Sequence, residues 1–439
     1  VVVLTTLLTG CTGKEPNEIA YVVALGIDST DDDNYKITIQ YANTTQISGG
    51  ASESGGKAGS EIVDNVTIEA PNIYAGVGLA NNIVSKSFSM SHAKLIVFSK
   101  EIAEKGVKDM IETLVRSEEI RPDVFIAVAN TTANDYLTSV NPEMEVNPAQ
   151  YYQLIYQKNQ LVGIPDGQLR EFFTGLYTDN YDSILPVAGV IEGSGGNSQN
   201  DDREQSKDGQ NEGSDGSSES LDSFESKSSD DKDENEKEKD AEKNTSKYEY
   251  DIKNYVGGET AIEKKNKAEA IGAAVFEKDK MVGELGEVET EICKMLKGDY
   301  TYSYLTYYNN DTPDIPITVK TTQQKKPKYK INTDKKTVDI ELYIESDLYS
   351  LPADYNVENK IEDFERDVAN YTSSACTEFI NNFTKKYNSD ILKLNEKVKY
   401  KFLTNNQYNW FKKNVGWSEY KFSVCTNFKV RRTGLIVRE

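Results

Sequence analysis

The sequence predicts an α+β, multi-domain protein in which helices pack on mixed or antiparallel sheets and one long helix lies against a C-terminal antiparallel sheet. Strand-like and helix-like segments alternate along the first part of the chain, which is typical of mixed α/β or α+β architecture. Near the end, a long amphipathic helix precedes a long alternating strand, an order that fits a helix laid across an antiparallel sheet. A chain of 439 residues is long enough for roughly two to four domains.

The first part of the chain should open with a β-hairpin. Residues 19–28 form an apolar run, residues 35–41 alternate strictly between apolar and polar side chains, and a turn-rich sequence joins them. The elements expected next are a helix over 71–86 with Pro71 in its first turn, a strand over 94–98, one helix over 101–118, a strand over 123–129, and a helix capped by Thr131 or Thr132.

The last part of the chain should combine hairpins with a long helix. Two apolar strands, 270–276 and 280–283, flank a short polar turn and predict a hairpin. The elements expected after it are a helix over 284–297 and strands over 314–320, 327–332 and 336–345. From about residue 355 to 387, apolar residues recur at three-or-four spacing and predict one long helix. The alternating strand over 420–430 should have one face in water.

A strongly acidic stretch interrupts these elements. Residues 192–246 contain 18 Asp or Glu and 7 Lys or Arg, so they carry −11 of the net charge of −22. We expect disorder, because so few large apolar side chains cannot offset the loss of chain entropy. A metal-binding acidic tract is the alternative, although lysines interrupt the carboxylates and no calcium-loop spacing is present. The expected divisions are a signal-peptide remnant (1–10), an N-terminal α/β region (11–191), the acidic insert (192–247), a middle region (248–310) and a C-terminal α+β domain (311–439).

Composition argues against several classes of function. A net charge of −22 is unfavourable for a nucleic-acid partner, because phosphate backbones are bound by clustered Lys and Arg. The single histidine, His92, excludes a His-rich metal site, and we expect it to be structural or exposed. Because no phosphate-binding, dinucleotide-binding or metalloprotease motif is present, we expect no enzyme activity, no cofactor and no metal. The sequence leaves open whether Cys293, Cys376 and Cys425 include a disulfide or are small buried hydrophobic residues.

The amino-terminal residues predict a lipid anchor at Cys11. An apolar run, shorter than the ~20 residues that cross a membrane, ends in Leu8-Thr9-Gly10-Cys11. This sequence has the form of a lipobox, in which small residues precede the cut and the cysteine thiol receives a diacylglyceryl group. No Met or basic stretch precedes the run, so we expect the sequence to begin partway through a signal peptide. A coincidental apolar end with a free cysteine is the alternative.

Four segments, taken in order, point to a known family. They are EIAYVVALGID at 18–28 with YKITIQY after it, SHAKLIVFSKEIAEKGVKDMIETLVRSEEIRPDVFIAVA at 91–129, IGAAVFEKDKMVGELGEVET at 271–290, and VRRTGLIV at 430–437. Together they resemble the Ger(x)C family, the lipoprotein C subunits of spore germinant receptors. Arg116, Glu119 and Arg121 fill the family's Arg-x-x-Glu-x-Arg pattern, and Arg431 and Arg432 fill its Arg-Arg-Thr-Gly. The chain departs from the family pattern at Thr12, where a Trp is usual, at 389–395, which replaces a Gly-rich turn, and in the length of its insert.

The resemblance implies three consecutive α/β-type domains, no enzymatic activity, and a lipid-anchored position on the outer face of the spore inner membrane. It also implies two partners: a polytopic B subunit and an A subunit with soluble and membrane parts, which together respond to small nutrients. It supplies no catalytic residues. Two interpretations stay open for Arg116, Glu119 and Arg121, and also for Arg431 and Arg432. They form either structural salt bridges or a partner-binding surface.

Two other functions remain as alternatives. The first is a solute-binding lipoprotein that captures a small-molecule germinant itself, although such proteins normally show two similar lobes and this sequence shows no repeated lobe. The second is a cell-wall hydrolase that works with two carboxylates. No pair of carboxylates is marked for that role, and pairs such as Glu118-Glu119 lie on a helix face expected to be solvated.

Overall fold

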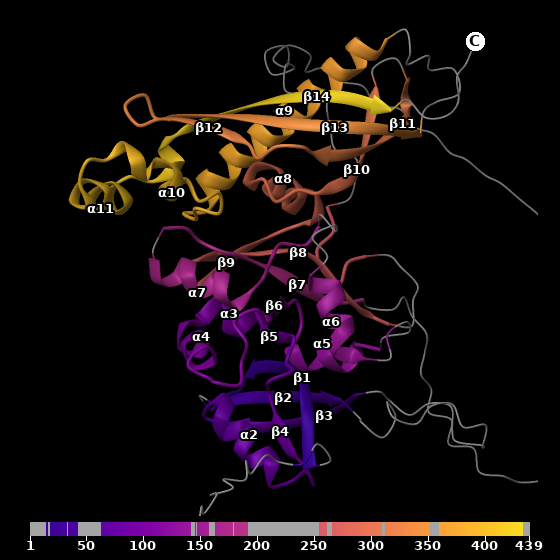
Figure 1. Ribbon diagram of the computed structural model, residues 1–439, viewed down its shortest axis with the longest axis vertical. Helices are drawn as coiled ribbons and strands as arrows, with labels where there is room; N and C mark the ends of the chain where they lie inside the picture. The colour runs from indigo at the N-terminus through magenta and orange to yellow at the C-terminus, as the bar shows by residue number, and fades with distance from the viewer. Residues whose placement is uncertain are drawn as a thin grey trace, which may run out of the picture. The chain divides into compact units, whose positions relative to one another are not determined.

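The structure, a computed structural model, confirms the α+β class. It describes residues 15, 18–32, 34–42, 63–141, 145, 147–157, 163–178, 180–191, 254–260, 266–309, 312–350 and 360–432. Cys11 and the acidic stretch over 192–246 lie outside the described residues, so neither expectation about them is tested. The described part contains two sheets with helices packed on them (Figure 1).

The first sheet has nine strands in the order β3-β2-β1-β5-β6-β7-β8-β9, with β4 paired to β1. Their bounds are β1 Ile19–Ser29, β2 Tyr35–Ala42, β3 Val63–Ala70, β4 Ser87–Ser89, β5 Leu95–Ser99, β6 Phe125–Ala129, β7 Ile184–Val190, β8 Ala268–Glu277 and β9 Lys280–Leu285. The central strands β1, β5, β6 and β7 run parallel, and antiparallel hairpins extend the sheet on both sides. The two predicted hairpins, β1–β2 and β8–β9, are confirmed.

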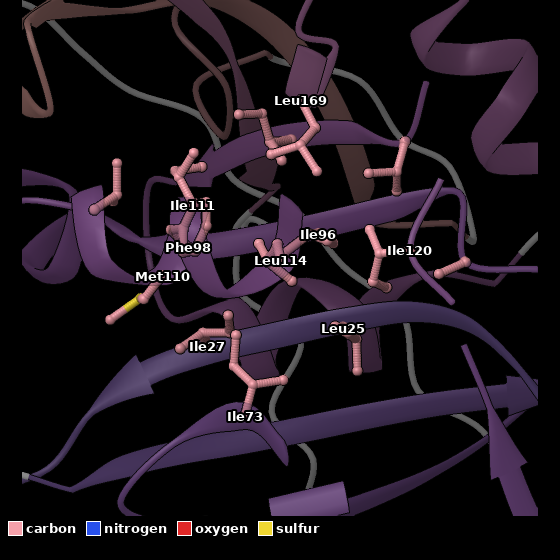
Figure 2. Close-up of a cluster of buried hydrophobic side chains, with 14 of the residues drawn as sticks. Leu25, Ile27, Ile73, Ile96, Phe98, Met110, Ile111, Leu114, Ile120 and Leu169 are labelled. Atoms are coloured by element: carbon pink, nitrogen blue, oxygen red, sulfur yellow. The ribbon is translucent and has the colours of Figure 1, made fainter. Parts of the chain in front are cut away.

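Helices cover both faces of this sheet, which explains why its central strands are apolar on both sides. One face carries α2 (Ile73–Asn81), α3 (Lys100–Lys105), α4 (Lys108–Val115) and α7 (Leu169–Thr178). The other face carries α5 (Ala133–Ser139) and α6 (Pro148–Tyr156). In Figure 2, Leu25 and Ile27 of β1 lie with Ile96 and Phe98 of β5 in the first of these cores, where Ile111 of α4 packs.

Two predicted helices are shorter than expected. The helix predicted over 71–86 spans only Ile73–Asn81, and Asn72, not Pro71, begins it by accepting a hydrogen bond from the Ala75 N–H. The single helix predicted over 101–118 is wrong, because α3 ends at Gly106, whose φ is +124°. The Val107 N–H turns away to donate to the Asp279 carbonyl at 3.0 Å. Of the two predicted caps, Thr132 caps α5 through the Asp135 N–H.

The second sheet has five strands in the order β10-β11-β13-β12, with β14 paired to β13. Its elements and the helices around it are β10 Tyr302–Asn309, β11 Thr312–Gln323, β12 Lys328–Asn332, β13 Thr337–Ser350, β14 Lys421–Arg432, α8 Glu287–Lys297, α9 Ile361–Lys386, α10 Leu394–Val398, α11 Asn405–Asn414, and the 3-10 helices η2 Lys399–Lys401 and η3 Trp417–Glu419. All of these strands except β10 are predicted by the sequence. The predicted region 248–310 is divided between the sheets, since β8 and β9 extend the first and β10 belongs to the second.

The predicted long helix against a C-terminal sheet is present as α9, which begins at Ile361. Its apolar positions Phe364, Val368, Phe379 and Phe383 are buried as the spacing predicts. The sheet, however, is mixed and not purely antiparallel, because β14 runs parallel to β13. The reason is the connection: the chain leaves β13, crosses the sheet as α9 and returns, and such a helical crossover places two strands in parallel.

The free edge of β14 is covered by polar side chains of α9. The N–H groups of Phe422, Val424, Thr426 and Val430 donate to side-chain oxygens of Asn381, Thr377, Ser373 and Glu365. These acceptors lie four or eight residues apart on the helix, and the donors lie two or four apart on the strand. Four residues of helix rise about 6 Å and two residues of strand about 6.6 Å, so the two repeats stay in step. The helix thus takes the place of a further strand at an otherwise exposed edge.

Candidate functional site

The described surface is hollowed where the connection between α9 and α10 meets the turn between β8 and β9. This hollow has a volume of about 530 Å³, and we call it the junction cleft. Its lining includes Tyr181, Asp182, Lys278, Asp390, Lys412 and Trp417. The cleft therefore combines residues just before β7 and between β8 and β9 with residues of the α9–α10 connection, α11 and η3.

Asp182 forms the wall of the junction cleft by binding two separate loops. Its Oδ1 accepts the Lys278 N–H at 2.8 Å, in the turn where Lys278 has a φ of +58°. Its Oδ2 accepts the Asp390 N–H at 2.8 Å, and its own N–H donates to the Asp390 carbonyl at 3.2 Å. One carboxylate therefore ties the β8–β9 turn to the α9–α10 connection.

Asp390 lies at the base of the cleft, with only 5% of its surface exposed. Its two carboxyl oxygens accept the N–H groups of Leu394 and Asn395, each at 2.8 Å, and so begin α10. Burial raises the pKa of Asp390 to about 7, and these backbone hydrogen bonds only partly oppose the shift. Asp390 is thus a buried carboxyl group that changes its charge near neutral pH.

Further contacts fix the same connection to the first sheet. Ser389 Oγ donates to the Phe276 carbonyl at 2.8 Å, and Asn388 Nδ2 donates to Glu277 Oε1 at 2.9 Å. Lys393 forms an ion pair with Glu171, and its ammonium group lies 4.1 Å from the ring centre of Tyr181. Since Asp182, Ser389 and Asp390 already bind backbone groups of the chain, these contacts hold α10 against the first sheet.

A second group of buried polar side chains surrounds α8. Tyr300 donates to Glu291 at 3.2 Å, and the Lys294 ammonium donates to the Ile164 carbonyl at 3.0 Å. Burial raises the pKa of Glu291 to about 7 and lowers the pKa of Lys294 to about 8. These groups lie between the hairpin β8–β9 and the second sheet, where α8 packs.

The described residues offer little for catalysis or metal binding. Cys293 and Cys376 are buried and free, and burial raises the pKa of each thiol to about 12. Cys425 is exposed and free, so among the described residues no disulfide joins these three. His92 lies against Tyr21, with ring centres 4.8 Å apart. In the described part of the chain, no three His, Cys, Asp or Glu side chains gather as a metal site would require.

The structure does not join Arg116, Glu119 and Arg121 in one salt-bridge cluster. Arg116 ends α4 and pairs with Glu112 one turn earlier, at 3.0 Å. Glu119 accepts the Met90 N–H at 2.8 Å and so fixes the segment before β5. Arg121 is exposed and contributes its carbonyl to the turn that leads into β6.

Arg431 and Arg432 lie at the end of β14. Arg431 pairs with Glu345 of β13, whereas Arg432 is exposed and stands opposite Asp347 in the strand register. Arg116 and Arg431 thus each pair with a carboxylate of the chain. Arg121 and Arg432 are exposed to solvent, where a partner could reach them. A partner-binding role for the five residues stays a prediction.

Sequence reasoning missed Asp182 and Asp390. They are 208 residues apart, and neither lies in a repeated or spaced motif. The one available signal was the replacement of a Gly-rich turn at 389–395, because a polar connection in place of glycines indicates a segment fixed by side-chain contacts.

Within the described residues, no helix has both the length and the apolar character needed to cross a membrane.

Comparison with known proteins identifies the family. The model of the spore germination protein N-terminal domain matches residues 13–190, and that of the spore germination B3/GerAC-like C-terminal domain matches residues 271–434. Among similar proteins, spore germination protein KC of Bacillus subtilis (strain 168) is 28% identical over 163 residues, which are 34% of this chain and 40% of that protein. Spore germination protein B3 of the same organism is 26% identical over 148 residues, 31% and 36% of the two chains.

Two further matches come from another species and from a solved structure. GerQC of Bacillus cereus is 27% identical over 104 residues, 24% of this chain and 29% of that protein. The crystal structure of the GerBC protein has a TM-score of 0.49 and 14% identity, covering 92% of this chain and 96% of that one. The matched segments thus span two fifths or less of the curated relatives. With both domain models matched in order, the chain belongs to the Ger(x)C family of spore germination proteins.

Proposed function

We propose that this chain is the lipid-anchored, non-catalytic C subunit of a spore germinant receptor, required for germination in response to nutrients. The observation that carries the proposal is the match of both family domains, one on each side of the acidic insert. A role without catalysis is supported by the junction cleft, because its carboxylates Asp182 and Asp390 already accept hydrogen bonds from the chain itself. Polytopic B and mixed A subunits are the proposed partners.

The proposed anchor is the diacylglyceryl group on Cys11, on the outer face of the spore inner membrane. Each buried CH₂ of an acyl chain contributes ~0.8 kcal/mol, so two acyl chains hold a soluble body stably at a membrane. The peptide between Cys11 and the first strand at Ile19 is short. An anchored chain would therefore keep its first sheet close to the membrane surface.

The test is Cys11→Ala in spores that lack the other subunits and in spores that contain them. We expect the variant to leave the membrane fraction when the partners are absent and to slow nutrient germination when they are present. Cys425→Ala is the matched control, because Cys425 is exposed and free on β14. If Cys11→Ala protein stays in the membrane fraction without its partners, the anchoring argument is wrong.

One observation favours the second candidate, direct capture of a small solute. The junction cleft has the size of a small-molecule site, with carboxylate and ammonium groups that suit an amino acid. Against it, Asp182 and Asp390 already accept hydrogen bonds from the chain itself. Calorimetric titration of the soluble chain with amino acids separates the two, because micromolar binding that is lost in Lys412→Met would favour capture over a purely structural cleft.

A further inference from the structure

One lobe of this acidic protein has the opposite charge. Residues 393–414, which form α10, η2 and α11, contain six lysines and a single acidic residue, Glu396, for a net charge of +5. The whole chain has a net charge of −22. Charges beyond about 8 Å are screened at physiological ionic strength, so a binding surface would experience the local positive charge of this lobe.

The lobe also exposes large apolar side chains. Leu403 is 95% exposed, Tyr400 is 77% exposed and Trp410 is 64% exposed. Leu403 and Trp410 border a shallow groove of about 620 Å³, whose lining also includes Lys401. A single exposed Leu is ordinary on a soluble protein, but Leu403 and Trp410 share one groove and the exposed Tyr400 lies three residues before Leu403, and such a gathering requires an explanation.

The lobe also buries apolar residues in the core that it shares with α9 and the second sheet, so these three residues are not exposed for lack of packing. Phe402 packs against Phe411, with tilted rings whose centres lie 4.9 Å apart, and against Tyr408 at 5.9 Å. Trp417, 8% exposed, closes the same cluster and donates to Asn395 Oδ1 at 3.2 Å. Neighbouring residues in the sequence therefore divide between a core and an outward apolar surface.

Lysines flank the apolar surface. Lys399 and Lys401 stand on either side of Tyr400, and Lys413 follows Trp410 by three residues; all three lysines are exposed, although the Lys401 ammonium also donates to the Ile331 carbonyl. Trp and Tyr prefer the interface between lipid and water, and lysines next to them bind the headgroups of anionic lipids. An exposed apolar surface with lysines beside it is thus complementary to an anionic bilayer in both charge and polarity.

We propose that the lobe formed by residues 393–414 docks on an anionic lipid surface, with Leu403, Tyr400 and Trp410 entering the headgroup region and the exposed lysines binding lipid phosphates. This contact is separate from the acyl group proposed on Cys11. It would give the chain a second membrane contact. Two contacts fix the orientation of the chain on the membrane, whereas one acyl anchor does not. A protein partner at this surface is the competing outcome.

The test uses the full chain with Cys11→Ser, so that no acyl group contributes. Its sedimentation is measured with vesicles of phosphatidylcholine alone and with vesicles that also contain phosphatidylglycerol, at low and at high salt. We expect at least tenfold stronger binding to the anionic vesicles, reduced at high salt. Trp410 and Trp417 are the only two tryptophans, so a blue shift of the emission that Trp410→Phe abolishes would place Trp410 in lipid.

Two variants test the parts of the surface separately. Lys399→Glu with Lys413→Glu should weaken binding about tenfold or more, and Leu403→Asp about tenfold. The matched controls are Lys108→Glu with Lys335→Glu, and Ile83→Asp, because these exposed residues lie outside the lobe. If anionic and neutral vesicles bind equally, or if the lobe variants bind as well as their controls, the proposal is wrong. The exposed apolar surface of the lobe would then be assigned to a protein partner.

Discussion

Asp390→Asn should change how the stability of the protein depends on pH. Burial raises the pKa of Asp390 to about 7 in the folded chain, from an ordinary value of 3.8. Because the folded chain binds this proton more tightly than the unfolded chain, the stability that it contributes is complete below about pH 3.8 and is lost as the pH rises through 7. An amide of nearly the same size cannot titrate, so the variant lacks this dependence.

The magnitude follows from the two pKa values. Between about pH 5 and about pH 8, a shift from 3.8 to about 7 corresponds to a loss of roughly 2–3 kcal/mol of unfolding free energy in the parent chain. The variant has a separate cost, since Asn offers one oxygen to the N–H groups of Leu394 and Asn395. Losing the second acceptor costs about 1–3 kcal/mol. The variant should therefore be less stable at about pH 5 and nearly equal to the parent at about pH 8.

Urea unfolding at several pH values measures both effects. Trp417 fluorescence is a suitable probe, because its indole donates to Asn395 beside the α9–α10 connection. Asp123→Asn is the control, as Asp123 is exposed and its substitution should leave the pH dependence unchanged. If Asp390→Asn shows the same fall in stability between about pH 5 and pH 8 as the parent, the assignment of this titration to the junction cleft is refuted.

Four further outcomes are expected. Gly106→Ala should cost about 1–3 kcal/mol, because φ is +124° there and the new Cβ would lie 2.7 Å from Asp279; Gly78→Ala, in open space on α2, should gain up to about 1 kcal/mol in the same denaturation assay. Thr377→Val should cost about 1–3 kcal/mol by leaving the Val424 N–H without an acceptor, and Thr377→Ser should recover most of it. Glu291→Gln should flatten the fall in stability as the pH rises through 7, since burial raises the pKa of Glu291; an unchanged profile would contradict this. Replacing residues 193–253 by a short Gly-Ser linker should change the unfolding free energy by less than about 1 kcal/mol, because the β7–β8 pairing lies wholly in residues outside that stretch.

Local patterns predicted most of the elements. The apolar runs of β1 and β8, the alternation of β2 and β14 and the three-or-four spacing of α9 reflect which faces each element buries, and burial can be inferred from the sequence residue by residue. The predictions are wrong where the end or the direction of an element is not determined by burial. Gly106 ends a helix whose apolar spacing continues beyond it, and the direction of β14 depends on a crossover that no strand pattern records.

The junction cleft could not be predicted in the same way. Asp182 and Asp390 meet only because the first sheet brings the β8–β9 turn to the end of α9, and neither carboxylate belongs to a local pattern. Nor does the family pattern mark them. The Arg and Glu residues that it does mark, Arg116 and Glu119, are in different contacts, each made with a nearby part of the chain.

The polar face of α9 shows why a charge and polarity pattern alone is ambiguous. Glu365, Ser373, Thr377 and Asn381 lie on one stripe, and a helix with a polar stripe opposite its apolar face is normally solvated there. Here the stripe pairs with the backbone of an edge strand, and each side chain accepts an N–H that would otherwise be open to a second chain. A polar stripe in water and a polar stripe that covers a strand edge require the same residue types at the same spacing. What distinguishes them is a strand about forty to sixty-five residues later, whose own repeat of two residues matches the helical repeat of four in length. A stripe of polar acceptors spaced four or eight residues apart, followed by an alternating strand, is therefore the pattern that predicts a covered sheet edge.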